Sequence, residues 1–171
     1  ADLLVGRTDE IRQLETGGEY AMVWDRAVAH LNLNFTNLPD MNAGEELVSI
    51  LIRTDQPLVN NFSLTTDGEL VLPQTPGTDN VLTIMRHSGN MYLTSDASIR
   101  DVWVCVRPCT VNEITVEILT NEASYVKSWT GISRTFSRNR RNTMNINMKG
   151  ARRIATGSTS DTKSLRTVFD T

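Results

Sequence analysis

Short runs of alternating apolar and polar residues, separated by turn-forming residues, dominate the chain after residue 29. Leu31, Leu33 and Phe35 alternate with polar residues, and a similar alternation returns over residues 114–119. A period of two places the apolar side chains on one face of a strand. Roughly six to eight such segments, with turn signals about every 10 residues, predict a mainly β protein with an antiparallel, jelly-roll-like β-sandwich rather than alternating β-α units.

Two of these segments carry more specific signals. Residues 62–72 contain Thr-Asp-Gly between two apolar runs, which predicts a β-hairpin. Residues 102–106 alternate valine with Trp103 and Cys105. We therefore expect a strand with its valines on one face and Trp103 and Cys105 on the other, ended by Pro108.

The beginning of the chain carries a different pattern. Residues 8–15 start with Thr8, which suits the N-terminal cap of a helix, and Gly17 suits a helix stop. Apolar residues from Tyr20 to Leu31 then recur at i, i+3, i+4 and i+7, the spacing of one helical face. The sequence therefore predicts one or two short N-terminal helices, the second leading directly into a strand.

Charge divides the chain into two parts. Residues 1–126 contain 7 basic and 18 acidic residues, whereas residues 127–171 contain 10 basic and 2 acidic residues. The second part is also rich in Asn, Ser and Thr, and its apolar residues are widely spaced. We therefore expect a β-sandwich body with an N-terminal helical segment over residues 1–130, and an extended basic C-terminal tail over residues 131–171.

The candidate binding residues are the basic side chains of this tail. They are Arg134, Arg138, Arg140, Arg141, Lys149, Arg152 and Arg153. In one interpretation they pair with the acidic body of the same chain or of a neighbouring copy. In another they neutralise phosphates, which is how nucleic acid is bound without regard to sequence. A third interpretation leaves the tail solvated without a partner.

Cys105 and Cys109 form a C-x₃-C pair. In an extended strand two residues four apart lie about 13 Å from each other. A disulfide requires Cα atoms within about 7 Å, so it would need a sharp turn at Pro108. A zinc site needs four ligands, and only His30 and His87 could complete one, without matching spacing. The pattern favours free, buried thiols and no metal.

No catalytic motif stands out in the sequence. It contains no phosphate loop, dinucleotide fingerprint, zinc-protease motif or nucleophile elbow. His87 and Ser88 are adjacent, so in a strand their side chains would point to opposite faces and could not form a nucleophile–base pair. The sequence contains no run of about 20 apolar residues, so it predicts no membrane-spanning helix. We expect neither an enzyme nor a cofactor, and no small-molecule substrate is evident.

A resemblance to a known family rests on residues 102–107, Val-Trp-Val-Cys-Val-Arg, and on the basic polar tail. This run is similar to a core strand of some plant-virus coats, and the chain resembles small viral jelly-roll coat proteins. The resemblance implies a self-assembling structural subunit of a virion, found there or in the host cytoplasm, whose basic segment contacts nucleic acid or a neighbouring subunit. Coat arms are commonly N-terminal, whereas the N-terminal part is acidic here. The alternative is a non-catalytic binding module, such as a virion matrix, tail or adhesin-like domain, that recognises protein or carbohydrate.

Overall fold

The computed structural model describes residues 4–8, 16–59, 63–65, 70–71, 81–85 and 98–155, and this part of the chain contains strands and no helix. The mainly β fold with antiparallel pairing is confirmed. The strands are β1 (Leu4–Thr8), β2 (Met22–Arg26), β3 (Ala29–Thr36), β4 (Leu47–Thr54), β5 (Ser63–Leu64), β6 (Leu70–Val71), β7 (Val81–Met85), β8 (Ile99–Val106), β9 (Cys109–Thr120), β10 (Ala123–Phe136), β11 (Arg141–Asn147) and β12 (Arg152–Ala155).

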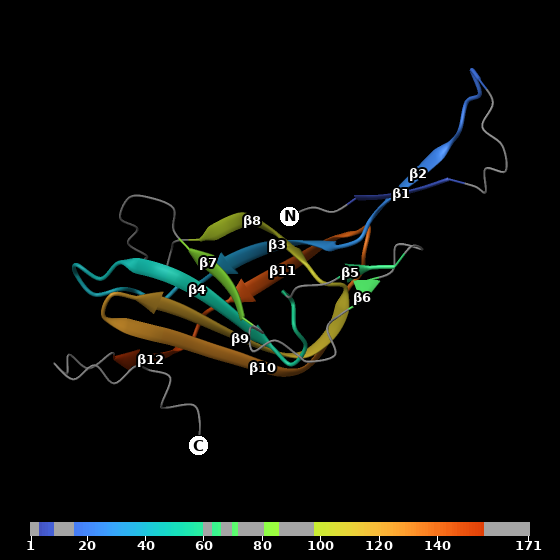
Figure 1. Ribbon diagram of the computed structural model, residues 1–171. Coiled ribbons are helices and arrows are strands. Elements are labelled where there is room, and N and C mark those ends of the chain that lie inside the picture. The colour runs from blue at the N-terminus through green and yellow to red at the C-terminus, as the bar shows by residue number, and fades with distance from the viewer. Residues whose placement is uncertain are drawn as a thin grey trace.

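Two sheets make up the body of the molecule (Figure 1). One has five strands in the order β12-β10-β9-β4-β7, and the other has three in the order β11-β3-β8. Neighbouring strands are antiparallel, except that β11 runs parallel to β3. This parallel pair differs from the purely antiparallel arrangement that the sequence predicts.

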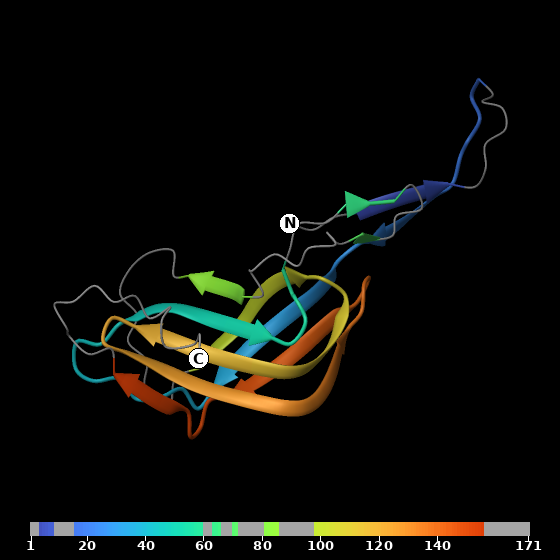
Figure 2. The same cartoon turned by 60° about the horizontal axis from the view of Figure 1, so that its bottom comes forward.

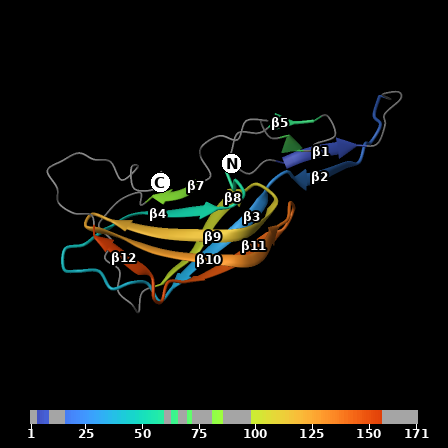
Figure 3. The same ribbon diagram turned by 90° about the horizontal axis from the view of Figure 1, so that it is seen from below.

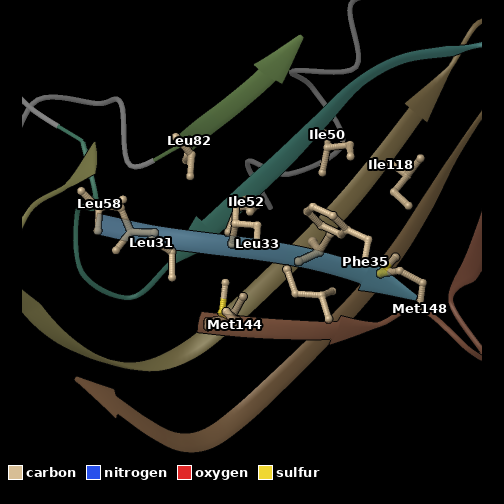
Figure 4. Packing of buried hydrophobic residues seen from close by; sticks show 14 of the residues in the cluster. Leu31, Leu33, Phe35, Ile50, Ile52, Leu58, Leu82, Ile118, Met144 and Met148 are labelled. Atoms are coloured by element: carbon tan, nitrogen blue, oxygen red, sulfur yellow. The ribbon is translucent and has the colours of Figure 1, made fainter. Parts of the chain in front are cut away.

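One hydrophobic core receives side chains from both sheets (Figure 4). The alternation in β3 points Leu31, Leu33 and Phe35 into it, and all three are fully buried. Ile52 of β4 and Ile118 of β9 approach from the five-stranded sheet. Burying each side chain of this size stabilises the fold by about 1.5–3 kcal/mol, so the shared core holds the two sheets together.

The chain passes from one sheet to the other between β8 and β9. Val106 ends β8 inside the core, and Trp103 of the same strand is half exposed on the opposite face, as the sequence predicts. The backbone N–H of Arg107 donates to the carbonyl of Leu58 at 2.8 Å. Pro108 follows and lies outside both flanking strands, which fits a residue that cannot donate a backbone hydrogen bond.

The predicted N-terminal helices are wrong where the structure describes them. The stretch from Tyr20 to Leu31 forms β2 and the start of β3, and Thr8 lies in β1. Residues 9–15 lie outside the described residues. The apolar residues recur at helical spacing by chance, because this stretch consists of two strands separated by a bend at residues 27–28. Aromatic and β-branched residues such as Trp24 and Val23 favour strands over helices.

β1 and β2 pair with each other and form a ribbon (Figures 1 and 2). The ribbon extends away from the body, and Figure 3 shows the same arrangement from below. β5 and β6 form a second two-stranded sheet, which agrees with the predicted hairpin. No helix in the described residues is long and apolar enough to cross a membrane.

As far as residue 155, the segment that the sequence assigns to an extended tail instead forms strands of the body. The expected boundary between residues 130 and 131 falls inside β10, and β11 and β12 follow. Met144, Ile146 and Met148 are buried in the common core. Their spacing of two residues is that of a strand with one buried face. Residues 156–171 lie outside the described part of the chain.

Both cysteines are free thiols and half buried, so the prediction of free thiols is confirmed and that of full burial is not. Burial raises the pKa of the Cys109 thiol, and Asp55 adds to this, whereas Arg107 acts in the opposite direction. A thiol with a raised pKa carries little of the reactive thiolate at neutral pH. No group of His, Cys, Asp or Glu that could hold a metal ion occurs among the described residues.

Candidate interaction site

The most unusual surface of the molecule is the ribbon, defined here as residues 4–8 and 16–26. Its large apolar side chains are exposed, and its described residues contribute no member to the hydrophobic core. The exposed fractions are 50% for Leu4, 43% for Tyr20, 51% for Met22, 65% for Val23 and 60% for Trp24. Met22 and Trp24 share one face of the ribbon, and Val23 lies on the other. Exposed apolar surface of this kind marks interaction sites.

One face of the ribbon is built around Gly6. Gly6 pairs with Trp24 in the antiparallel register. A Cβ atom at position 6 would lie 2.8 Å from the Met22 sulfur and 2.9 Å from the Trp24 ring. Both side chains therefore fold over the glycine and form one continuous apolar surface that a larger residue would displace.

The turn between β10 and β11 fixes the base of the ribbon. The side-chain amide of Asn139 donates to Asp25 Oδ1 at 2.8 Å, and its oxygen accepts from the backbone N–H of Arg26 at 3.4 Å. Arg138 Nε donates to the Arg26 carbonyl at 3.2 Å. Asn139 adopts a positive φ of 59°, a conformation that asparagine tolerates better than most residues. This basic turn therefore helps to set the direction of the ribbon.

The structure does not bring the seven predicted basic residues into one patch. Arg138 and Arg140 precede β11 and Arg141 begins it, whereas Lys149, Arg152 and Arg153 follow its end. A strand of this length separates the two groups by roughly 20 Å. Arg134 lies on β10 and donates from Nη2 to the Thr143 carbonyl at 2.7 Å.

Several of these basic residues have partners in their own chain. Arg153 Nη2 lies 3.6 Å from the Glu45 carboxylate, and the Arg141 guanidinium lies 6.0 Å from the centre of the Trp103 ring. Arg140, Lys149 and Arg152 are exposed. Arg153 thus agrees with the interpretation that tail residues pair with the acidic body.

Glu45 is the fully buried acid of this arrangement. Its carboxylate accepts hydrogen bonds from Thr120 Oγ1, from the Asn42 backbone N–H at 2.9 Å and from the Tyr125 hydroxyl at 3.1 Å. Burial by itself would raise the pKa of Glu45. The three hydrogen bonds and Arg153 outweigh that effect and hold the pKa below its usual value. The ionised carboxylate therefore joins the loop before β4 to β9, β10 and β12.

The outer face of the three-stranded sheet is polar. Asn34 Nδ2 donates to Asn145 Oδ1 at 3.2 Å, and Asn32 Nδ2 donates to Asp101 Oδ1 at 3.0 Å. A hollow of about 390 Å³ on this side is lined by His30, Trp103, Val104, Cys105 and Arg141. Amide side chains beside a half-exposed tryptophan offer hydrogen bonds and a flat apolar surface together.

A second hollow, of about 280 Å³, lies between β10 and β11. Its lining is mainly apolar and comes from both sheets: Ile114, Trp129, Ile132, Met144 and Ile146, with Arg134 and Asn145 beside them. We call it the β10–β11 hollow.

Sequence reasoning missed the ribbon and both hollows. The ribbon has a usable signal, because Gly17-Gly18 precedes a run rich in aromatic and β-branched residues that ends at Trp24. The hollows have none, because their walls come from segments distant in the sequence. No family model matches the chain, and neither a curated protein nor a solved structure shows significant similarity to it.

Proposed function

We propose that this protein is a structural subunit that assembles with copies of itself, and that the ribbon makes the contact. The observation that carries the proposal is the exposure of Met22, Val23 and Trp24 on a ribbon that projects from the body. Covering such side chains removes apolar surface from water, and each one contributes about 1.5–3 kcal/mol when fully buried. Tryptophan is also among the residues enriched at the energetic centres of interfaces.

The kind of subunit proposed is a viral coat protein, present in the virion or in the host cytoplasm. Two features support this proposal. The sheets surround one shared core, which is compatible with a sandwich-like body. The exposed residues Arg140, Arg141, Lys149 and Arg152 offer positive charge on the outside of that body. In the proposal they contact nucleic acid or an acidic surface of a neighbouring subunit.

The test compares two tryptophans by sedimentation velocity. Trp24→Ala removes a ribbon side chain, and Trp103→Ala removes a side chain of similar exposure from the body. The wild-type protein and Trp103→Ala should sediment as the same oligomer, and Trp24→Ala should dissociate at roughly 10- to 100-fold higher concentration. A wild-type protein that stays monomeric at all accessible concentrations would refute the proposal.

The second candidate is a non-catalytic binding module for protein or carbohydrate. The observation that favours it is the outer face of the three-stranded sheet, where an asparagine network lies beside Trp103 and Arg141. This candidate predicts a small monomeric species free of nucleic acid, for which Trp103→Ala, and not Trp24→Ala, weakens capture on protein or glycan arrays.

A further inference from the structure

The β10–β11 hollow lies where β10 departs from regular geometry. The pairing of β10 with β9 shifts register between Thr130 and Arg134. Gly131 and Ser133, inside this interval, have positive φ values of 67° and 44°. A bulge bends a strand and increases its local twist. At this point Ile132 is 36% exposed and borders the hollow instead of filling it.

We propose that the β10–β11 hollow receives the apolar face of the ribbon from a second copy of this chain, with Trp24 as the inserted side chain. This inference rests on the proposed self-assembly and identifies the surface that the ribbon contacts.

The size and the lining of the hollow fit the Trp24 side chain of a second copy. Small-molecule sites commonly measure about 300–1,000 Å³, so a hollow of about 280 Å³ lies just below this range and suits one large side chain. Trp129, Ile132 and Met144 offer an aromatic ring, a branched side chain and a thioether. Aromatic pairs and contacts between methionine sulfur and a ring add to the effect of apolar burial. On the ribbon, the packing of Trp24 and Met22 over Gly6 presents a matching apolar surface.

One pair of opposite charges also favours a second copy. Glu19 is exposed on the ribbon next to Tyr20. The hollow has Arg134 in its wall. Opposite charges at an interface steer the two surfaces together and oppose incorrect docking.

The ribbon is directed away from β10 and β11, which line the hollow of the same molecule. It projects from the body in the three views of Figures 1, 2 and 3. The hydrogen bonds of Asn139 and Arg138 to Asp25 and Arg26 hold its base in that direction. A ribbon held in this way is available to another molecule.

The experiment uses two variants of the full chain, alone and mixed. Trp24→Ala lacks the inserted side chain, and Ile132→Arg places a charge in the hollow. Each variant alone should dissociate at roughly 10- to 100-fold higher concentration than wild type. An equimolar mixture should form a 1:1 dimer, because the intact ribbon of the Ile132→Arg copy docks in the intact hollow of the Trp24→Ala copy. Met85→Arg, at a side chain on β7 that is 71% exposed, serves as a control and should assemble like wild type.

The outcomes separate the two proposals. If Ile132→Arg assembles like wild type while Trp24→Ala does not, the ribbon docks elsewhere and only the inference about the hollow is overturned. If the mixture yields no 1:1 dimer although both variants retain wild-type circular dichroism and thermal unfolding, the inference is also overturned. If wild type itself does not assemble, the proposed function fails first.

Discussion

The ribbon and the C-terminal strands β11 and β12 differ in burial, and the difference is the opposite of what their sequences lead one to expect. The ribbon is richer in large apolar residues, yet Met22, Val23 and Trp24 are exposed. The C-terminal segment is basic and rich in asparagine, yet Met144, Ile146 and Met148 are almost fully buried. Apolar content by itself therefore does not determine burial. A segment is buried when a second surface covers it, and within one chain β11 has such a surface in β3 and the five-stranded sheet.

The largest difference between the two regions should appear when one apolar side chain is shortened in each. Ile146→Ala should lower the free energy of unfolding by about 3 kcal/mol, because it opens a cavity in the core. Val23→Ala should change the stability of the monomer by less than about 0.5 kcal/mol, because its side chain is already in water. Urea unfolding below the concentration of assembly measures both. Equal losses of unfolding free energy in the two variants would show that the ribbon is packed within the monomer.

A second prediction concerns how polar contacts hold β12 to the body. Glu45→Gln should lower the free energy of unfolding at neutral pH by about 2 kcal/mol, because it removes the charge from the hydrogen bonds of a buried carboxylate. The pKa of Glu45 is lowered in the folded protein. Its stabilising effect is therefore complete above the ordinary glutamate pKa and is lost as the pH falls through the lowered value.

The measurement is denaturant unfolding from neutral pH down to about pH 3, with Thr115→Val as a matched control at an exposed hydrogen bond between Thr115 and Ser128. The difference between wild type and Glu45→Gln should shrink as the pH falls, whereas the control should differ little at any pH. A difference independent of pH would show that the charge of Glu45 has no part in stability.

The smallest expected effect concerns the exposed basic residues. If Arg140, Arg141, Lys149 and Arg152 each neutralise one phosphate, the log–log salt slope of single-stranded nucleic-acid binding should be about −3. Replacing Arg140 and Arg141 together by Ala should reduce its magnitude by about 1.4. Fluorescence anisotropy over a salt series measures this slope. Arg153→Ala is the control, because that side chain is paired with Glu45, and a similar reduction there would contradict the assignment.

Local alternation is enough to predict some strands. β3, β8 and β9 were predicted because each alternates apolar and polar residues along itself, and a strand's two faces follow from its own backbone. The valines and Trp103 of β8 lie on the faces expected of them. For β2 the local pattern gave the wrong prediction, because Tyr20, Val23, Trp24 and Val28 satisfy helical spacing.

Only the tertiary structure decided which surfaces became covered. The parallel pairing of β11 with β3 joins residues more than 100 positions apart, and no local pattern records such a partner. No local pattern records the contacts of the buried Glu45 with Thr120, Tyr125 and Arg153 either. Composition alone identified the basic residues, but it could not separate Arg153, paired with a buried acid, from the exposed Arg140. Strand character depends on backbone and side-chain geometry within a few residues, whereas burial and charge pairing depend on what the rest of the chain brings alongside.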